Sequence, residues 1–195
     1  MIAHSNISEK NEAILQASLR LFVEYGFHGT PTSKIAAEAG TAHGTIFTYY
    51  KTKDDLIAAL YEYVKNEFRD FLVKNVRGEG TIKERLRDIF FYSVQWSLDN
   101  RKEFYFTQQF QYSTHLKKAS TESIVKEKSL HRAIYQEALD NKVFRPLPFE
   151  MIAELAMSQM IGMFQFLSEG NYPPSETKAL IDEAFKGMWR MLAVV

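Results

Sequence analysis

The sequence predicts an all-α protein, with an N-terminal three-helix domain of the helix-turn-helix type joined to a larger helical bundle. Apolar residues recur at three- and four-residue spacing through long segments, and no segment shows the alternation of a strand. Short breaks containing Gly or Pro divide these segments into separate helices. The predicted domains cover residues 1–52 and 53–195.

The composition narrows the classes of function. The chain has 195 residues, of which 46% are hydrophobic and 25% charged, which is typical of a globular protein with a buried core. Cys is absent and the five His are scattered, so we expect no disulfide, no metal site and no cofactor. No apolar run reaches the roughly 18 to 20 residues of a membrane span, and the N-terminus lacks a signal pattern. We therefore expect a cytoplasmic protein.

The first predicted helix runs from about Ser8 to Tyr25. Gly26 is expected to end it, because glycine accepts the left-handed conformation common at helix C-termini. Its buried stripe is predicted to consist of Ile14, Ala17, Leu21, Phe22 and Tyr25.

Residues 32–50 predict two short helices that cross at a tight turn. Such a crossing needs a small residue at the contact and a turn residue that accepts positive φ, and Ala36 and Gly40 meet these needs. Thr32 stands where an N-cap is expected. The second helix opens with short side chains at 42–45, as close approach to the major groove requires. The pattern favours a DNA-recognition helix; an ordinary helical hairpin is the alternative.

Many fixed spacings in the first quarter of the chain resemble the TetR family of bacterial regulators, in its TetR/AcrR-like form. The matching residues are Ile14, Leu15, Ala17, Leu21, Phe22, Gly26, Phe27, Thr30, Thr32, Ile35, Ala36, Ala39, Gly40, Gly44, Thr45, Ile46, Tyr49, Tyr50 and Lys53. The resemblance implies a homodimer whose two recognition helices enter successive major grooves of a palindromic operator. It further implies a transcriptional repressor that a small-molecule effector releases from DNA.

The resemblance assigns DNA contacts by position. Thr32 and Lys53 are expected to bind phosphate, and residues 41–45 to face the groove. The complete predicted DNA-binding set is Thr32, Ser33, Thr41, Ala42, His43, Gly44, Thr45, Phe47, Thr48, Tyr49 and Lys53. Two positions depart from the family pattern: Phe47 stands where a tyrosine is common, and His43 where Lys or Arg is frequent.

The charge of the N-terminal segment is less positive than DNA binding favours. Residues 1–55 carry five Lys and Arg against six Asp and Glu. The positions of the basic residues offset this slightly negative net charge, because Lys34, His43, Lys51 and Lys53 cluster around the predicted recognition helix. Several of the acidic residues fall in predicted first turns of helices, where the helix dipole favours them.

The remaining helices are predicted at about 53–76, 81–100, 103–112, 120–141, 149–168 and 175–193. Thr81 and Glu84 form a capping-box pattern at the start of the second of these. The helix at 53–76 is the expected mechanical link between the two domains, although a plain bundle helix fits its sequence equally well.

An aromatic run between residues 90 and 112 wraps around its helices and so suggests a pocket for an apolar or aromatic effector. For any single ring, core packing is the alternative. The predicted ligand-binding residues are Phe68, Phe91, Trp96, Phe104, Phe110, Tyr135 and Met163.

The last two helices carry more apolar surface than a terminal hairpin needs. In proteins of the resembled family the corresponding helices form a four-helix dimer interface, and Ala156 and Gly162 would allow close approach of a partner helix. The predicted interface residues are Ile152, Leu155, Ala156, Met160, Met163, Leu180, Ala184 and Met188. Packing within one chain is the alternative.

Two other classes of protein compete with a regulator. A helical small-molecule-binding protein without DNA-binding activity fits the near-neutral N-terminal segment. An enzyme is not expected, because His115 and His131 lie on separate segments with no obvious catalytic partner.

Overall fold

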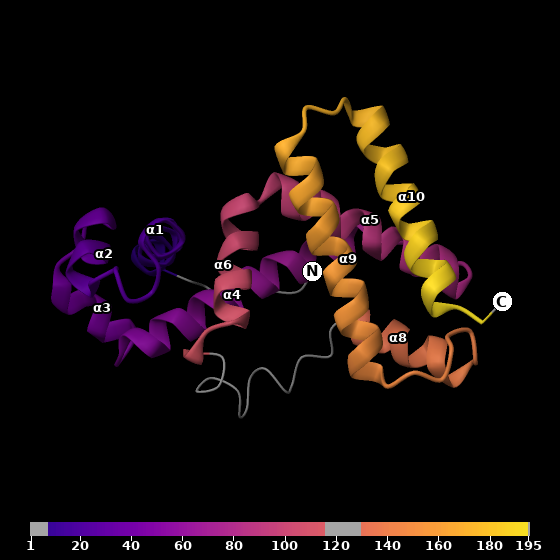
Figure 1. Cartoon of the computed structure of the whole chain (residues 1–195). Coiled ribbons are helices and arrows are strands. Elements are labelled where there is room, and N and C mark those ends of the chain that lie inside the picture. The colour runs from indigo at the N-terminus through magenta and orange to yellow at the C-terminus, as the bar shows by residue number, and fades with distance from the viewer. Residues whose placement is uncertain (1–7, 116–129, 195) are drawn as a thin grey trace. The chain divides into compact units, whose positions relative to one another are not determined.

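The computed structural model describes residues 8–115 and 130–194, and these residues confirm the all-α class. Within these ranges the only β-type pairing is an isolated bridge between Phe144 and Ala193. The described helices are α1 (Glu9–Tyr25), α2 (Thr32–Glu38), α3 (His43–Tyr49), α4 (Lys53–Asn75), α5 (Ile82–Asp99), α6 (Arg101–Gln111), α8 (Leu130–Asp140), α9 (Phe149–Glu169) and α10 (Pro174–Leu192) (Figure 1). The N-terminal part of the helix predicted at 120–141 falls outside the described residues.

The described chain groups into two compact units. The first unit contains residues 8–66 and 101–115, and the second contains 67–100 and 130–194. Helix α4 therefore begins in the first unit and ends in the second. The predicted domain boundary lies at the first residue of α4, whereas the first unit continues to residue 66 and also includes α6.

The core of the first unit forms where α1 packs against α2 and α6. Ile14, Phe22 and Ile35 are fully buried there. Phe22 stacks on Phe106 of α6, with ring centroids 6.5 Å apart, and Phe27 meets the same ring edge-on at 5.9 Å. Helix α6 thus supplies part of the hydrophobic core behind the predicted DNA-binding helices.

The prediction that Tyr25 is buried is wrong. Its side chain is 46% exposed, and the Lys34 ammonium lies 3.3 Å from the centre of its ring. Tyr25 is the last residue of α1, so its ring extends past the packed part of the helix, and a cation–π contact covers it instead of the core.

The turn between α2 and α3 has the predicted glycine geometry. Gly40 adopts a φ of 63°, and its N–H donates to the carbonyl of Ala37. The next N–H, from Thr41, reaches back to the carbonyl of Ala36 at 2.9 Å. These two bonds form the Schellman motif, which ends α2 sharply and positions α3 to cross it.

The predicted N-cap role of Thr32 is wrong. Pro31 occupies the N-cap position of α2 and Thr32 is the first helical residue, so the Thr32 hydroxyl does not cap the helix. That hydroxyl is available for the contact with α3 described below.

The second unit is built from α5, α8, α9, α10 and the end of α4. The predicted capping box starts α5: Thr81 accepts from the Glu84 N–H, while the Glu84 carboxylate accepts from the Thr81 N–H. The buried core residues of this unit are Leu86, Ile89, Phe90, Val94, Ile134, Tyr135, Ala138, Phe144, Ile152, Ala156, Leu167, Ile181, Phe185, Met188 and Leu192.

Two arginines on α5 clamp neighbouring helices of the second unit. The Arg87 guanidinium donates to both carboxylate oxygens of Asp182 on α10, at 3.0 and 2.9 Å. The Arg85 guanidinium likewise donates two hydrogen bonds to the Glu137 carboxylate on α8. Such paired hydrogen bonds fix the orientation of the two side chains as well as their distance.

None of the helices in the described ranges is both long enough and apolar enough to span a membrane.

Candidate nucleic-acid interface

Helix α3 presents most of its predicted DNA-binding residues outward. Ile46 is buried and holds the helix on the core, whereas Phe47 is 45% and Tyr49 39% exposed. Around these lie the exposed residues Ala42, His43, Gly44 and Thr48, with Thr41 and Thr45 half-buried. The predicted recognition residues thus form one accessible surface, which we call the α3 surface.

Thr32 and His43 meet across the two helices. The Thr32 hydroxyl and the His43 Nε2 atom are hydrogen-bonded at 2.9 Å, and the His43 ring packs edge-on against Phe47 at 5.2 Å. The neighbouring Ser33 is exposed on α2. Thr32, a predicted phosphate contact, and His43, a predicted groove contact, therefore position each other through this hydrogen bond.

Two tyrosines fix α3 to the start of α1. The Tyr49 and Ser8 hydroxyls lie 2.8 Å apart, and the buried Tyr50 donates its hydroxyl proton to the Asn11 side-chain oxygen. Burial raises the pKa of Tyr50, partly offset by the bond to Asn11. The sequence reasoning missed Ser8 and Asn11 as supports of α3; the N-cap position of Ser8 marked only the start of α1.

Lys53 points inward in this structure. Its ammonium donates to the backbone carbonyl of Phe27 and lies 6.0 Å from the centre of the Phe22 ring. Burial lowers its pKa, against the opposing charge of Asp54. The direct contact of Lys53 with phosphate stays a prediction, and the observed contact joins α4 to the turn that precedes α2.

A partly buried histidine also contacts the first turn of α4. The His115 ring is 12% exposed, and its Nδ1 lies 2.9 Å from an Asp54 carboxylate oxygen. Its ring packs edge-on against Phe27 at 5.0 Å. The sequence did not predict this contact, because nothing in the local pattern around His115 shows that the segment after α6 lies beside the start of α4.

The predicted ligand-binding residues divide between the two units. Phe104 and Phe110 are buried in the first unit, where Phe110 stacks on Tyr61 with ring centroids 4.1 Å apart. They belong to the core around α6, so the structure does not group them with the other predicted ligand-binding residues.

Three of the predicted residues do come together in the second unit. Phe68 lies 4.9 Å from the Trp96 ring and stacks on His131 at 5.9 Å, and His131 meets Tyr135 at 6.2 Å. His131 is also 3.3 Å from the Ser93 hydroxyl. The result is a cluster of aromatic rings around one polar pair, and its central residue, His131, was not among the predictions. Burial strongly raises the pKa of Tyr135.

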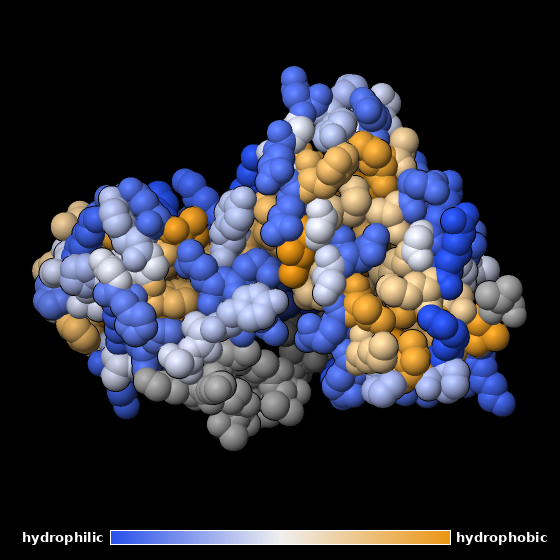
Figure 2. Space-filling view, in the orientation of Figure 1, coloured by the Kyte–Doolittle hydropathy of each residue, from blue (hydrophilic) through white to orange (hydrophobic). Residues whose placement is uncertain are grey.

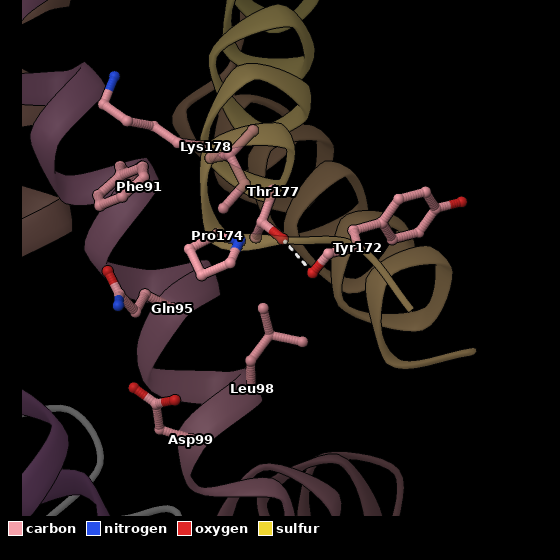
Figure 3. A pocket seen from close by; sticks show the side chains of 9 residues that line it. Phe91, Gln95, Leu98, Asp99, Tyr172, Pro174, Thr177 and Lys178 are labelled. Atoms are coloured by element: carbon pink, nitrogen blue, oxygen red, sulfur yellow. Dashed lines mark hydrogen bonds between the residues drawn. The ribbon is translucent and has the colours of Figure 1, made fainter. Parts of the chain in front are cut away.

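Phe91 lies away from that cluster, in a surface groove between α5 and the first turns of α10 (Figure 3). The groove has a volume of about 210 Å³. Its lining comprises Phe91, Gln95, Leu98, Asp99, Tyr172, Pro174, Thr177, Lys178 and Ile181. Met163, the last predicted ligand-binding residue, packs half-buried on the core of the second unit.

Apolar side chains gather over α9 and α10 on one face of the second unit (Figure 2). Of the predicted dimer-interface residues, Ile152, Ala156 and Met188 are buried within the chain's own core. The half-buried members are Leu155, Met160, Met163, Leu180 and Ala184. Met151, Met157 and Phe166 of α9 are exposed, although none of the three was predicted.

The α3 surface, with its buried supports and sharp turn, defines a helix-turn-helix protein of the kind that places a short helix against DNA. Two family profiles match the chain: "Bacterial regulatory proteins, tetR family" over residues 14–60, and "Tetracyclin repressor-like, C-terminal domain" over residues 54–194. Together they cover most of the sequence. The chain belongs to the tetR family of bacterial regulatory proteins.

Curated relatives match the N-terminal part of the chain. The fatty acid metabolism regulator protein of Bacillus subtilis is 34% identical over 73 residues, which are 37% of this chain and 38% of that protein. The regulator RutR of Escherichia coli is 36% identical over 58 residues, 30% of this chain and 27% of RutR. The chain thus spans well under half the length of these relatives in the matched regions.

Solved structures match over nearly the whole chain. A proposed tetR family transcription regulator from Shewanella sp. PV-4 has a TM-score of 0.85 at 26% identity, covering 96% of this chain and all of that one. The regulator FadR from Bacillus subtilis, solved with stearoyl-CoA, has a TM-score of 0.73 at 19% identity, covering 91% and 96%. The second similarity shows the fold alone.

Proposed function

We propose that the chain is a ligand-responsive DNA-binding transcriptional regulator that acts as a homodimeric repressor on a palindromic operator. The observation that carries the proposal is the α3 surface. Its side chains face outward, while Ile46, Tyr49 and Tyr50 tie the helix to the core and to α1. A recognition helix must be rigid to hold its side chains in register with base edges, and these ties supply that rigidity.

The electrostatics of the α3 surface fit modest DNA affinity. Lys34 and Lys51 are exposed beside it, and Arg20 forms a 3.1 Å ion pair with Glu38, which neutralises one nearby acid. Phosphate contacts supply most non-specific affinity, so few cations imply a shallow dependence on salt. Specific contacts from His43, Thr45 and Thr48 would then contribute a large share of binding.

Effector release is the second part of the proposal. Helix α4 has 23 residues and belongs to both compact units, so a ligand that shifts its second half also acts on its first half. The aromatic cluster around His131 contacts α4 through Phe68 and is the proposed effector site. A ligand needs only about 1 to 3 kcal/mol of differential affinity to change DNA affinity measurably.

Two relatives suggest which effectors to test first. The similar Bacillus subtilis protein is named as a regulator of fatty acid metabolism, and FadR was solved with stearoyl-CoA. The acyl chains of fatty acids and of their coenzyme A esters are apolar, as expected for ligands of a site lined by aromatic rings. They belong in the first effector screen.

Selection of bound duplexes from a random DNA pool tests the proposal. Gly44→Glu is the matched negative variant, because a Cβ added at Gly44 meets nothing within 4 Å and the new negative charge would repel the DNA phosphates. Gly78→Glu is the control, with the same change at an equally open position in the second unit. Enrichment of a palindrome by the native and Gly78→Glu proteins, but not by Gly44→Glu, supports the regulator.

The absence of any enriched sequence at low salt would favour the second candidate, a small-molecule-binding protein without DNA affinity. The observation behind that candidate is the charge of residues 1–55, where five Lys and Arg face six Asp and Glu.

A further inference from the structure

The surface groove between α5 and α10 is separate from the aromatic cluster around His131 and has a distinct chemistry. Its α5 wall consists of Phe91, Gln95, Leu98 and Asp99, which recur on one helix face at spacings of four, three and one. Pro174, Thr177 and Lys178 line the opposite side (Figure 3). Lys178 therefore lies beside Phe91 at one end of the groove and Asp99 lies at the other, with Gln95, Leu98, Pro174 and Thr177 between them.

The cation at one end of the groove is already paired. The Lys178 ammonium lies 2.8 Å from one carboxylate oxygen of Asp182, and each of the two oxygens of that carboxylate also accepts one hydrogen bond from Arg87. The same ammonium lies 6.0 Å from the centre of the Phe91 ring. Lys178 thus shares the Asp182 carboxylate with Arg87 and lies beside an aromatic ring.

The carboxylate at the other end has no such counter-charge. Across the described ranges, Asp99 takes part in no ion pair or side-chain hydrogen bond. It is the last residue of α5, where the partial negative charge of the helix C-terminus adds to its own. Arg101 and Lys102 follow within three residues, but within the described ranges neither forms an ion pair with Asp99. Asp99 stands eight residues from Phe91, which is about 12 Å along the helix, so the Lys178 charge near Phe91 compensates it weakly.

The volume of the groove limits the size of an occupant. An engineered apolar cavity of about 150 Å³ accommodates benzene, so a groove of about 210 Å³ has room for one aromatic ring and a short chain. A long acyl chain or a nucleotide would extend beyond it.

We propose that this groove binds a small arylalkylamine, with the ring between Phe91, Leu98 and Pro174 and the protonated amine at the Asp99 carboxylate. The amine supplies the missing counter-charge, and the ring covers apolar surface that is now in contact with water. This site goes beyond the proposed regulator function and requires no DNA.

Titration calorimetry of the full chain with 2-phenylethylamine tests the proposal. Saturable binding is expected for the amine. The matched neutral and anionic probes, 2-phenylethanol and 3-phenylpropionate, are expected to bind at least about fivefold more weakly, in line with a partly exposed ion pair. Equal binding of the alcohol, or no heat from the amine at millimolar concentration, would overturn the proposal.

Two variants locate the site. Asp99→Asn keeps the shape of the side chain but removes its charge, so amine affinity is expected to fall by about fivefold. Asp70→Asn, an exposed carboxylate on α4, is the control and should leave affinity unchanged. An Asp99→Asn protein that binds the amine as tightly as the native chain would show that the amine binds elsewhere.

Discussion

Thr30 shows how one buried hydroxyl positions the DNA-binding helices. The side chain is fully buried between α1 and α2, and its hydroxyl lies within hydrogen-bonding distance of the carbonyls of Leu21 and Gly26, at 3.1 and 2.9 Å. It thereby joins the end of α1 to the residue that precedes Pro31 and α2.

Replacing Thr30 with Val should destabilise the protein by about 1 to 3 kcal/mol, because the shape is retained while buried carbonyls lose their donor. Urea unfolding measures this change in the free energy of unfolding. Thr114→Val, at an exposed position, is the control and should change stability by less than about 0.5 kcal/mol. Equal stability of the two variants would contradict the structural role of the Thr30 hydroxyl.

His43 should contribute to DNA binding. It is exposed on the α3 surface, and its Nε2 atom is hydrogen-bonded to the Thr32 hydroxyl at 2.9 Å, so the ring is held in place at the predicted groove contact. We expect His43→Ala to weaken operator binding by about fivefold, because a single hydrogen bond contributes about 1 kcal/mol. Fluorescence anisotropy measures the change; equal affinity of the two proteins would show that His43 makes no contact with the operator.

At the scale of the element, the clamp between α5 and α10 predicts acid sensitivity of the second unit. Burial raises the pKa of Asp182, but hydrogen bonds and charge from Arg87 and Lys178 outweigh burial, and the net pKa is lowered. A carboxyl whose pKa is lower in the folded state stabilises the fold fully above its unfolded pKa, and this stabilisation is lost as the pH falls through the folded pKa.

Stability should therefore fall below about pH 4, and Asp182→Asn should show a smaller loss between pH 7 and pH 3 than the native chain. Thermal unfolding followed by circular dichroism at both pH values measures the difference. Glu137 contributes in the same direction, because the hydrogen bond from Arg85 lowers its pKa. An identical loss in native and Asp182→Asn proteins would show that the clamp does not contribute.

Local patterns predicted the elements well, because their causes lie within a few residues. The capping box at Thr81 and the positive φ of Gly40 both follow from nearest neighbours. The tertiary contacts of long side chains were less predictable from the sequence. Lys53 turns to the Phe27 carbonyl, and Phe104 packs in the first unit, because the tertiary neighbours of each lie far away in sequence. Periodicity shows that a residue is buried, but not which helix covers it.

At the scale of the whole molecule, Gly162 on α9 tests the proposed dimer. A Cβ added there meets nothing within 4 Å in the chain itself, so the chain's own packing does not require glycine. In an isolated chain, Gly162→Ala should stabilise the helix by about 0.5 to 1 kcal/mol.

If a partner helix packs closely at this position, the same substitution weakens dimerisation instead, and this is the result we expect. Sedimentation across a range of protein concentrations measures the dimer dissociation constant for the native and Gly162→Ala chains. A variant that melts at a higher temperature and dimerises as well as the native chain would place the interface elsewhere on the surface.

Because α6 contributes to the core of the first unit, that core cannot form completely until α6 has been synthesised. Phe106, which stacks on Phe22, lies more than eighty residues after it in the sequence. When the ribosome has synthesised α1 to α3, the rings that α6 contributes to their core are still missing, and they become available only after α5 and α6 have been made. A nascent chain therefore cannot complete the core behind its helix-turn-helix early, and a chain that ends before residue 101 lacks the α6 part of that core and is expected to be degraded by proteases.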